Sequence, residues 1–250
     1  MDTPTFGRFS PSVEQAIFLV GAAVASYLSG PGITENSNSV VTLITPANWA
    51  FAIWVPIFLI LGVVAIFPQW IKFEGMSGEG IRTSEWVESP DTRYWLMVCF
   101  ALLGSWGYIF NLRPVLGSYF PSVSNIGLAL YTAIAAKGTN SYGRSAGPLS
   151  PLIGWLTCAT AVNIAVWLKA DFGLADSDFL AGVVLFAVGI LACVACYLNH
   201  DWLYLLVILF TLVAIYARTG SAVPLVAAAF TVVGSVVAWN LYQPPTLSFK

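Results

Sequence analysis

Charged side chains are scarce in this sequence. Only 9% of the residues are Asp, Glu, Lys or Arg, and 58% are hydrophobic, whereas about a quarter of a soluble domain is charged. A soluble fold of this length cannot bury so much apolar surface, so the composition excludes a soluble protein and favours lipid as the solvent. The expected fold class is all-α, a polytopic bundle of transmembrane helices.

Other absences exclude classes of function. The ten Lys and Arg are scattered, so no basic stripe could follow a phosphate backbone, and nucleic-acid binding is excluded. No catalytic triad, phosphate-binding glycine loop or carboxylate pair stands in a credible context, so we do not expect an enzyme. No ionisable group lies well inside an apolar run, which argues against an ion-coupled transporter. The first twelve residues lack the apolar core of a signal peptide.

Eight apolar runs are present and predict eight membrane spans. They cover residues 13–30, 48–68, 94–112, 121–137, 150–169, 179–198, 202–218 and 222–242. The fourth is the weakest, because it contains Asn125 and ends at Lys137. Proline and glycine lie at the ends of the runs. Pro31-Gly32 is expected to end the first helix, and Pro46 and Pro151 are expected to begin later helices. The polar stretch 69–93 is expected to be a surface loop or a small amphipathic segment.

Basic residues predict the orientation of the chain. Eight spans place both termini on one face, and seven Lys and Arg fall there (Arg8, Lys72, Arg82, Arg93, Lys137, Arg144, Lys250) against three opposite (Arg113, Lys169, Arg218). The positive-inside rule therefore places the termini in the cytoplasm or an equivalent such as a stroma. A plastid thylakoid membrane and a bacterial inner membrane both fit this prediction.

Tryptophans divide into two groups. Most lie near span ends, as in an interfacial belt: Trp49, Trp70, Trp95, Trp167, Trp202 and Trp239. Three lie deeper. Trp54 precedes Phe58 by four residues, Trp106 precedes Phe110 by four, and Trp155 shares one side of its helix with Asn163. If these faces converge, they form a flat-walled apolar slot for a tetrapyrrole, sterol or carotenoid. The simpler alternative is aromatic packing within the bundle.

These motifs resemble a known family. The segment 151–163, with Pro151, Trp155, Asn163 and small residues between them, resembles the fifth-helix signature of the TspO/MBR family, the translocator or tryptophan-rich sensory proteins. The run from Thr45 through Trp54, Phe58 and Gly62 resembles that family's second helix, and Trp106 with Phe110 its third. The resemblance covers about residues 10–170. Cys99 and Leu103 stand where the family often has polar residues, so the family's polar ligand contacts from the third helix are not carried over.

The resemblance implies a five-helix core over residues 1–170, with residues 171–250 as additional transmembrane helices. It implies a cavity between helices, capped by the loop from about Pro31 to Thr45. Family members bind porphyrins, sterol-like lipids and other hydrophobic ligands, as sensors or carriers. The cavity residues carried over are Trp49, Trp54, Phe58, Trp106, Phe110, Trp155 and Asn163. A porphyrin, chlorophyll or carotenoid is the expected class of cofactor, and the lipid bilayer and a hydrophobic small molecule are the expected partners.

A second constellation supports a different function. Cys193, Cys196 and His200 lie at i, i+3 and i+7 on one helix face, where His200 could ligate chlorophyll or haem and the thiols could join a metal site. The alternative is that the thiols pack against helices while His200 caps a turn. Cys99 and Cys158 are expected to be buried small residues. With the added helices, His200 supports a second hypothesis: a structural or pigment-binding subunit of a larger complex such as a photosystem. A homodimer and a facilitative carrier for a lipophilic molecule are further alternatives.

Overall fold

Long helices pack side by side and form a bundle. The structure is a computed structural model, and it describes residues 11–66, 72–74, 80–82, 89–138, 147–174, 176–199 and 201–241. The long helical segments are α1 (Pro11–Ser39), η1 (Asn48–Ile53) running into α2 (Trp54–Ile66), α4 (Pro90–Asn111), α6 (Phe120–Gly138), α7 (Ser150–Phe172), α8 (Asp178–Asn199), α9 (Trp202–Thr219) and α10 (Val223–Leu241). The predicted all-α membrane bundle is confirmed. The first ten residues, Trp70, Arg144, His200 and Lys250, and the predictions made for them, lie outside the described residues.

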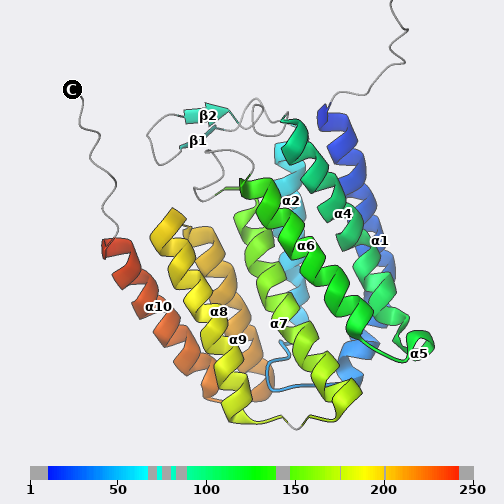
Figure 1. Cartoon of the computed structure of the whole chain (residues 1–250), viewed down its shortest axis with the longest axis vertical. Helices are drawn as coiled ribbons and strands as arrows, with labels where there is room; N and C mark the ends of the chain where they lie inside the picture. The colour runs from blue at the N-terminus through cyan, green and yellow to red at the C-terminus, as the bar shows by residue number, and fades with distance from the viewer. Residues whose placement is uncertain are drawn as a thin grey trace, which may run out of the picture.

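Seven of the helical segments are long and apolar enough to cross a membrane, so the chain is an integral multi-pass membrane protein. The exception is α6, the helix of the weakest apolar run. It packs between α4 and α7 (Figure 1). Its polar side chains bond to these neighbours: Asn125 Nδ2 donates to Ser105 Oγ at 3.0 Å, and Ser122 Oγ donates to Asn163 Oδ1 at 3.0 Å. Lower hydropathy in α6 thus reflects polar contacts inside the bundle.

The helices are arranged around a central group. In Figure 1, α1 and α4 lie on one side, α2, α6 and α7 in the middle, and α8, α9 and α10 on the other side. In this view α1 begins at its upper end and α10 finishes at its upper end, so the two outer helices start and end on the same side of the bundle. Which side of the membrane this end faces remains a prediction.

Short elements connect the helices. The charged stretch after α2 contains an antiparallel hairpin of β1 (Lys72–Glu74) and β2 (Gly80–Arg82), so part of the predicted loop or amphipathic segment is a β-hairpin. Between α4 and α6 lies the single turn α5 (Arg113–Leu116), which ends at Gly117 with a φ of +69°. Glycine adopts this left-handed conformation without a steric penalty, so it ends the turn.

The predicted end of the first helix at Pro31-Gly32 is wrong, because α1 continues through Pro31 to Ser39. A proline removes one helical hydrogen bond, but neighbouring helices can support a membrane helix past it. Asn111 of α4 does so here, donating from Nδ2 to Ser29 O at 3.2 Å and accepting at Oδ1 from Asn36 Nδ2 at 3.0 Å. These bonds lie on both sides of the proline. The connection before η1 is therefore shorter than the predicted loop and spans only residues 40–47.

Close packing of α1 on α4 depends on glycine, and Gly107→Ala is expected to reduce the free energy of unfolding by about 1–3 kcal/mol. A Cβ at Gly107 would lie 2.2 Å from Ser29 Oγ and 2.9 Å from Ile33 Cδ1, so α1 would have to shift. Thermal unfolding in detergent micelles measures the loss. Gly127→Ala in α6 is the control, because its Cβ would meet no atom within 4 Å and alanine favours a helix. Equal stability of the two variants would refute the close contact.

Candidate ligand-binding cavity

Aromatic residues of three helices lie around one space in the bundle. The rings of Trp54 (α2) and Trp155 (α7) meet edge to face, with centroids 6.1 Å apart, and Phe58 stacks on Trp54 at 5.4 Å. On α4, Trp106 and Phe110 lie 5.5 Å apart. Edge-to-face and offset contacts of this kind are favourable for aromatic rings. They form an aromatic wall at membrane depth that consists of one cluster on α2 and α7 and a second on α4.

A small enclosed cavity of about 50 Å³ lies against this wall. Its lining includes five of the seven predicted site residues, namely Trp54, Trp106, Phe110, Trp155 and Asn163. Other elements complete it: Ile33 from the continued part of α1, Thr45 from the connection before η1, and Thr211 from α9. Sequence reasoning missed these three residues, because nothing in their local pattern distinguishes them from ordinary packing residues.

A larger groove of about 630 Å³ lies between α1 and α2. It shares Ile33, Phe51, Trp54 and Trp106 with the enclosed cavity, so the same side chains form a wall of both spaces. Phe58 lines the groove but not the enclosed cavity. Exposed apolar residues, among them Tyr27, Val55 and Leu59, border the groove, which indicates that it faces the lipid.

Trp49 lies apart from both spaces. Its side chain is half exposed, and its ring meets Phe210 of α9 edge to face at 5.4 Å. Trp49 and Trp54 are five residues apart, which is close to one and a half turns of helix, so their side chains point in nearly opposite directions. The structure thus brings six of the predicted residues together and leaves Trp49 at the contact with α9.

The indole N–H groups of two residues that line the cavity have no acceptor. Among the described residues, the buried Nε1 atoms of Trp106 and Trp155 make no hydrogen bond. Asn163 is already engaged, because its Nδ2 donates to Ala159 O at 2.8 Å and its Oδ1 accepts from Ser122. An unsatisfied buried donor costs free energy, so a ligand that offers an acceptor to these indoles would remove that cost.

The connection from α1 to η1 closes one end of the cavity. Thr45 Oγ1 accepts from Thr42 N at 2.8 Å, which stabilises the turn. Two helices hold it in place: Lys169 Nζ of α7 donates to Val41 O at 2.7 Å, and Ala47 N donates to Ala214 O of α9 at 2.9 Å. The cap therefore consists of the end of α1 and residues 40–47, in place of the longer loop expected from Pro31 to Thr45.

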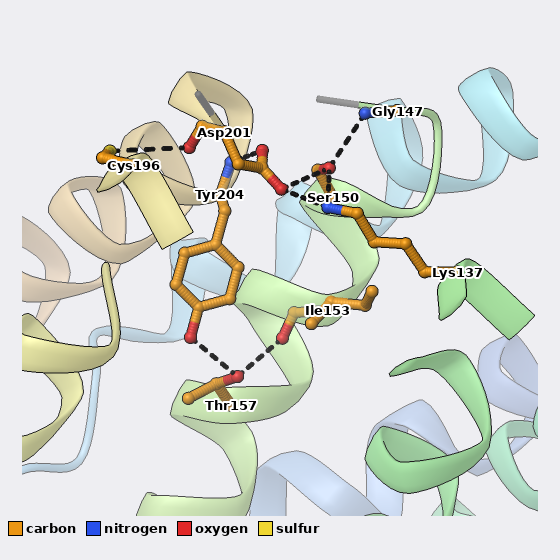
Figure 2. Close-up of polar contacts among 8 residues, drawn as sticks. All are labelled: Lys137, Gly147, Ser150, Ile153, Thr157, Cys196, Asp201 and Tyr204. Atoms are coloured by element: carbon orange, nitrogen blue, oxygen red, sulfur yellow. Dashed lines mark hydrogen bonds and ion pairs between the residues drawn. The ribbon is translucent and has the colours of Figure 1, made fainter. Parts of the chain in front are cut away.

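A buried ion pair and the hydrogen bonds around it join α6, α7 and the start of α9 (Figure 2). Asp201, with only 1% of its side chain exposed, pairs with Lys137 at the end of α6, which is 15% exposed. Asp201 also accepts from Ser150 Oγ of α7 at 2.7 Å and from Tyr204 N at 3.0 Å, so it caps the N-terminus of α9. Tyr204 Oη then donates to Thr157 Oγ1 at 3.1 Å. These bonds tie α9 to α6 and α7.

Sequence reasoning missed this network. An aspartate directly before the run 202–218 is a typical N-cap signal, so the role of Asp201 as a cap could have been predicted. The partner could not, because Lys137 is 64 residues away and only the packed bundle brings it close.

The described residues of the cysteine and histidine constellation, Cys193 and Cys196, are not part of a metal site. Cys193 packs so closely on α10 that a Cβ at Gly234 would lie 2.6 Å from its Sγ, and Cys196 Sγ donates to Asp201 O at 3.8 Å. Within the described ranges, no three His, Cys, Asp or Glu residues are grouped to hold a metal ion. Since His200 lies outside those ranges, its role as a pigment or haem ligand stays a prediction.

Comparison with known protein families gives a match over most of the chain. The family described as TSPO-like protein matches residues 12–242, and so extends from α1 through α10, beyond the residues 10–170 that the motifs covered. No curated protein and no solved structure matches the chain. The family match spans almost the whole sequence and agrees with the aromatic motifs on α2, α4 and α7. This integral membrane protein therefore belongs to the TSPO-like protein family.

Proposed function

We propose that the protein binds a planar hydrophobic ligand carrying a hydrogen-bond acceptor, and that it acts as a sensor or carrier of that ligand. Tetrapyrroles and oxygenated sterol-like lipids or carotenoids belong to this class. The observation that carries the proposal is that two tryptophans lining an apolar cavity, Trp106 and Trp155, each have a buried indole N–H group without an acceptor. Aromatic walls favour a flat ligand, and the two donors favour one with an oxygen or nitrogen acceptor.

Size supports a site that extends into the groove. Small-molecule sites usually measure about 300–1,000 Å³, and the enclosed cavity of about 50 Å³ is too small for such a ligand. The neighbouring groove of about 630 Å³ is large enough. We therefore propose that the body of the ligand lies between α1 and α2, and that one edge enters the cavity when the rings of Phe51, Trp54 and Trp106 move apart.

A ligand that enters this groove from the bilayer moves from lipid into a site that is about equally apolar. The hydrophobic effect then contributes little, and affinity depends on close packing and on hydrogen bonds. A hydrogen bond contributes about 0.5–1.5 kcal/mol net. The donors of Trp106 and Trp155 are thus expected to decide which apolar molecules are retained.

Titration of the purified protein with protoporphyrin tests the proposal. Trp155→Phe keeps an aromatic wall but removes one N–H, so we expect the dissociation constant to rise about two- to tenfold, in line with one lost hydrogen bond. The shift of the porphyrin absorption band measures binding without depending on the number of tryptophans. Trp49→Phe is the matched control, since Trp49 lies outside both spaces, and its dissociation constant should equal that of the wild type. An unchanged constant in Trp155→Phe would remove the site from this position.

A further inference from the structure

A second groove, of about 370 Å³, lies between α7 and α8. One stripe of α7 from Thr157 to Lys169 forms one wall, and the first half of α8 forms the other. Alanines stand at several wall positions, including Ala161 and Ala165 on α7 and Ala181 on α8. Their short side chains leave space between two helices that otherwise touch little.

The length of this groove corresponds to one leaflet of a bilayer. Thr157 and Lys169 are twelve residues apart on a helix, or about 18 Å at 1.5 Å per residue. Half of the hydrocarbon core of a membrane is about 15 Å thick. Lys169 lies near the end of α7, beside the connection to α8, so the groove runs from the membrane surface to about the middle of the bilayer. An extended acyl chain of one lipid fits these dimensions.

Charges occur at one end of the groove. Lys169 Nζ and Asp176 Oδ2 form an ion pair at 2.5 Å, with side chains 39% and 26% exposed. The lysine ammonium has three donors, of which Asp176 and Val41 O take two. One positive and one negative group side by side complement a headgroup that also carries both charges. A purely anionic headgroup would instead place a second negative charge next to Asp176.

We propose that this groove binds one zwitterionic phospholipid. One acyl chain lies along the alanines of α7 and α8, the phosphate lies beside Lys169, and the ammonium group lies beside Asp176. This site is separate from the tryptophan cavity, because the two spaces share no lining residue, and it does not depend on the function proposed for that cavity.

Native mass spectrometry of the full-length protein tests the proposal, with phosphatidylethanolamine and phosphatidylglycerol of identical chains added in equal amounts. We expect one retained phosphatidylethanolamine per chain, at least tenfold in excess of phosphatidylglycerol. The double variant Ala161→Leu/Ala165→Leu fills the groove and should lose this lipid at least tenfold. Ala101→Leu adds the same side chain on the exposed face of α4 and should retain it. Equal retention by the filled variant and the control would overturn the proposal.

A second double variant tests the charged end of the groove, and its result can be interpreted even if the filled variant does not fold. In Lys169→Gln/Asp176→Asn the glutamine amide still offers a donor to Val41 O, but both charges are gone. We expect the groove to retain a lipid chain and to lose the preference for phosphatidylethanolamine. Thermal unfolding of the variant serves as the folding control. If the preference persisted unchanged, or if the wild type retained both lipids equally, the assignment of the headgroup to Lys169 and Asp176 would be wrong.

Discussion

Replacing Lys137 by methionine is expected to lower the free energy of unfolding by about 3–5 kcal/mol, the usual cost of removing one partner of a buried ion pair. Methionine preserves most of the apolar stem but leaves the carboxylate of Asp201, which is 1% exposed, without its positive partner. Ser150 and the Tyr204 amide remain as donors, and they do not balance a full charge. Thermal unfolding in detergent micelles, followed by circular dichroism, measures the loss.

Neutralising the aspartate provides the control. In Lys137→Met/Asp201→Asn, the amide oxygen still accepts from Tyr204 N and caps α9, the amide nitrogen takes the second position and can donate to Ser150 Oγ, and no unpaired charge remains, so most of the lost stability should return. Asp201→Asn alone should cost less than Lys137→Met, because Lys137 is partly exposed and its flexible stem lets the ammonium reach the membrane surface. A double variant no more stable than Lys137→Met would show that the charge of Asp201 is not the cause.

Gly30→Leu is expected to weaken porphyrin binding at least tenfold, which corresponds to about 1.4 kcal/mol or more of binding free energy. Gly30 lines the groove between α1 and α2, and a Cβ there would meet no atom within 4 Å. A leucine side chain would therefore extend into the space assigned to the ligand without disturbing the helix. The same absorption titration used for Trp155→Phe measures the effect.

Gly21→Leu is the matched control, because Gly21 is also on α1, also has open space around it and does not line the groove. Leucine favours a helix over glycine by close to 1 kcal/mol, so both variants should unfold at the same or a higher temperature than the wild type. Lower affinity in Gly30→Leu alone would then reflect an occupied groove. Equal affinities in the two variants would place the ligand elsewhere.

The helices could be predicted because apolar length is a local property of the chain. Each predicted run corresponds to a helical segment. The low hydropathy of the fourth run also has a physical cause. Asn125 and Ser122, which weaken its hydropathy, are the side chains that bond α6 to α4 and α7. A residue that lowers the apolar signal is thus satisfied by its neighbours.

The length of α1 could not be predicted, because it depends on a distant residue. Pro31 ends a helix in isolation, but Asn111 supports the chain on both sides of it. Local propensity loses here to tertiary hydrogen bonding, as is usual where a neighbouring helix can replace missing bonds.

The candidate site was only partly predictable. Helical spacing placed Trp54 with Phe58, Trp106 with Phe110, and Trp155 with Asn163, since residues four or eight apart share a face. Spacing could not show that Trp49 lies in a 3-10 segment and contacts α9. It also could not show that Thr211 of α9 reaches the same cavity, because that contact exists only in the folded bundle.

The part played by α9 in this wall bears on how such proteins diversify. Thr211 lines the cavity, and Ala214 O accepts the amide of Ala47 next to it. A shortened gene product without α9 would leave that amide unsatisfied in an apolar setting and open one side of the recess. Substitutions in α9 would therefore change the wall of the proposed ligand site while the tryptophan motifs stay the same.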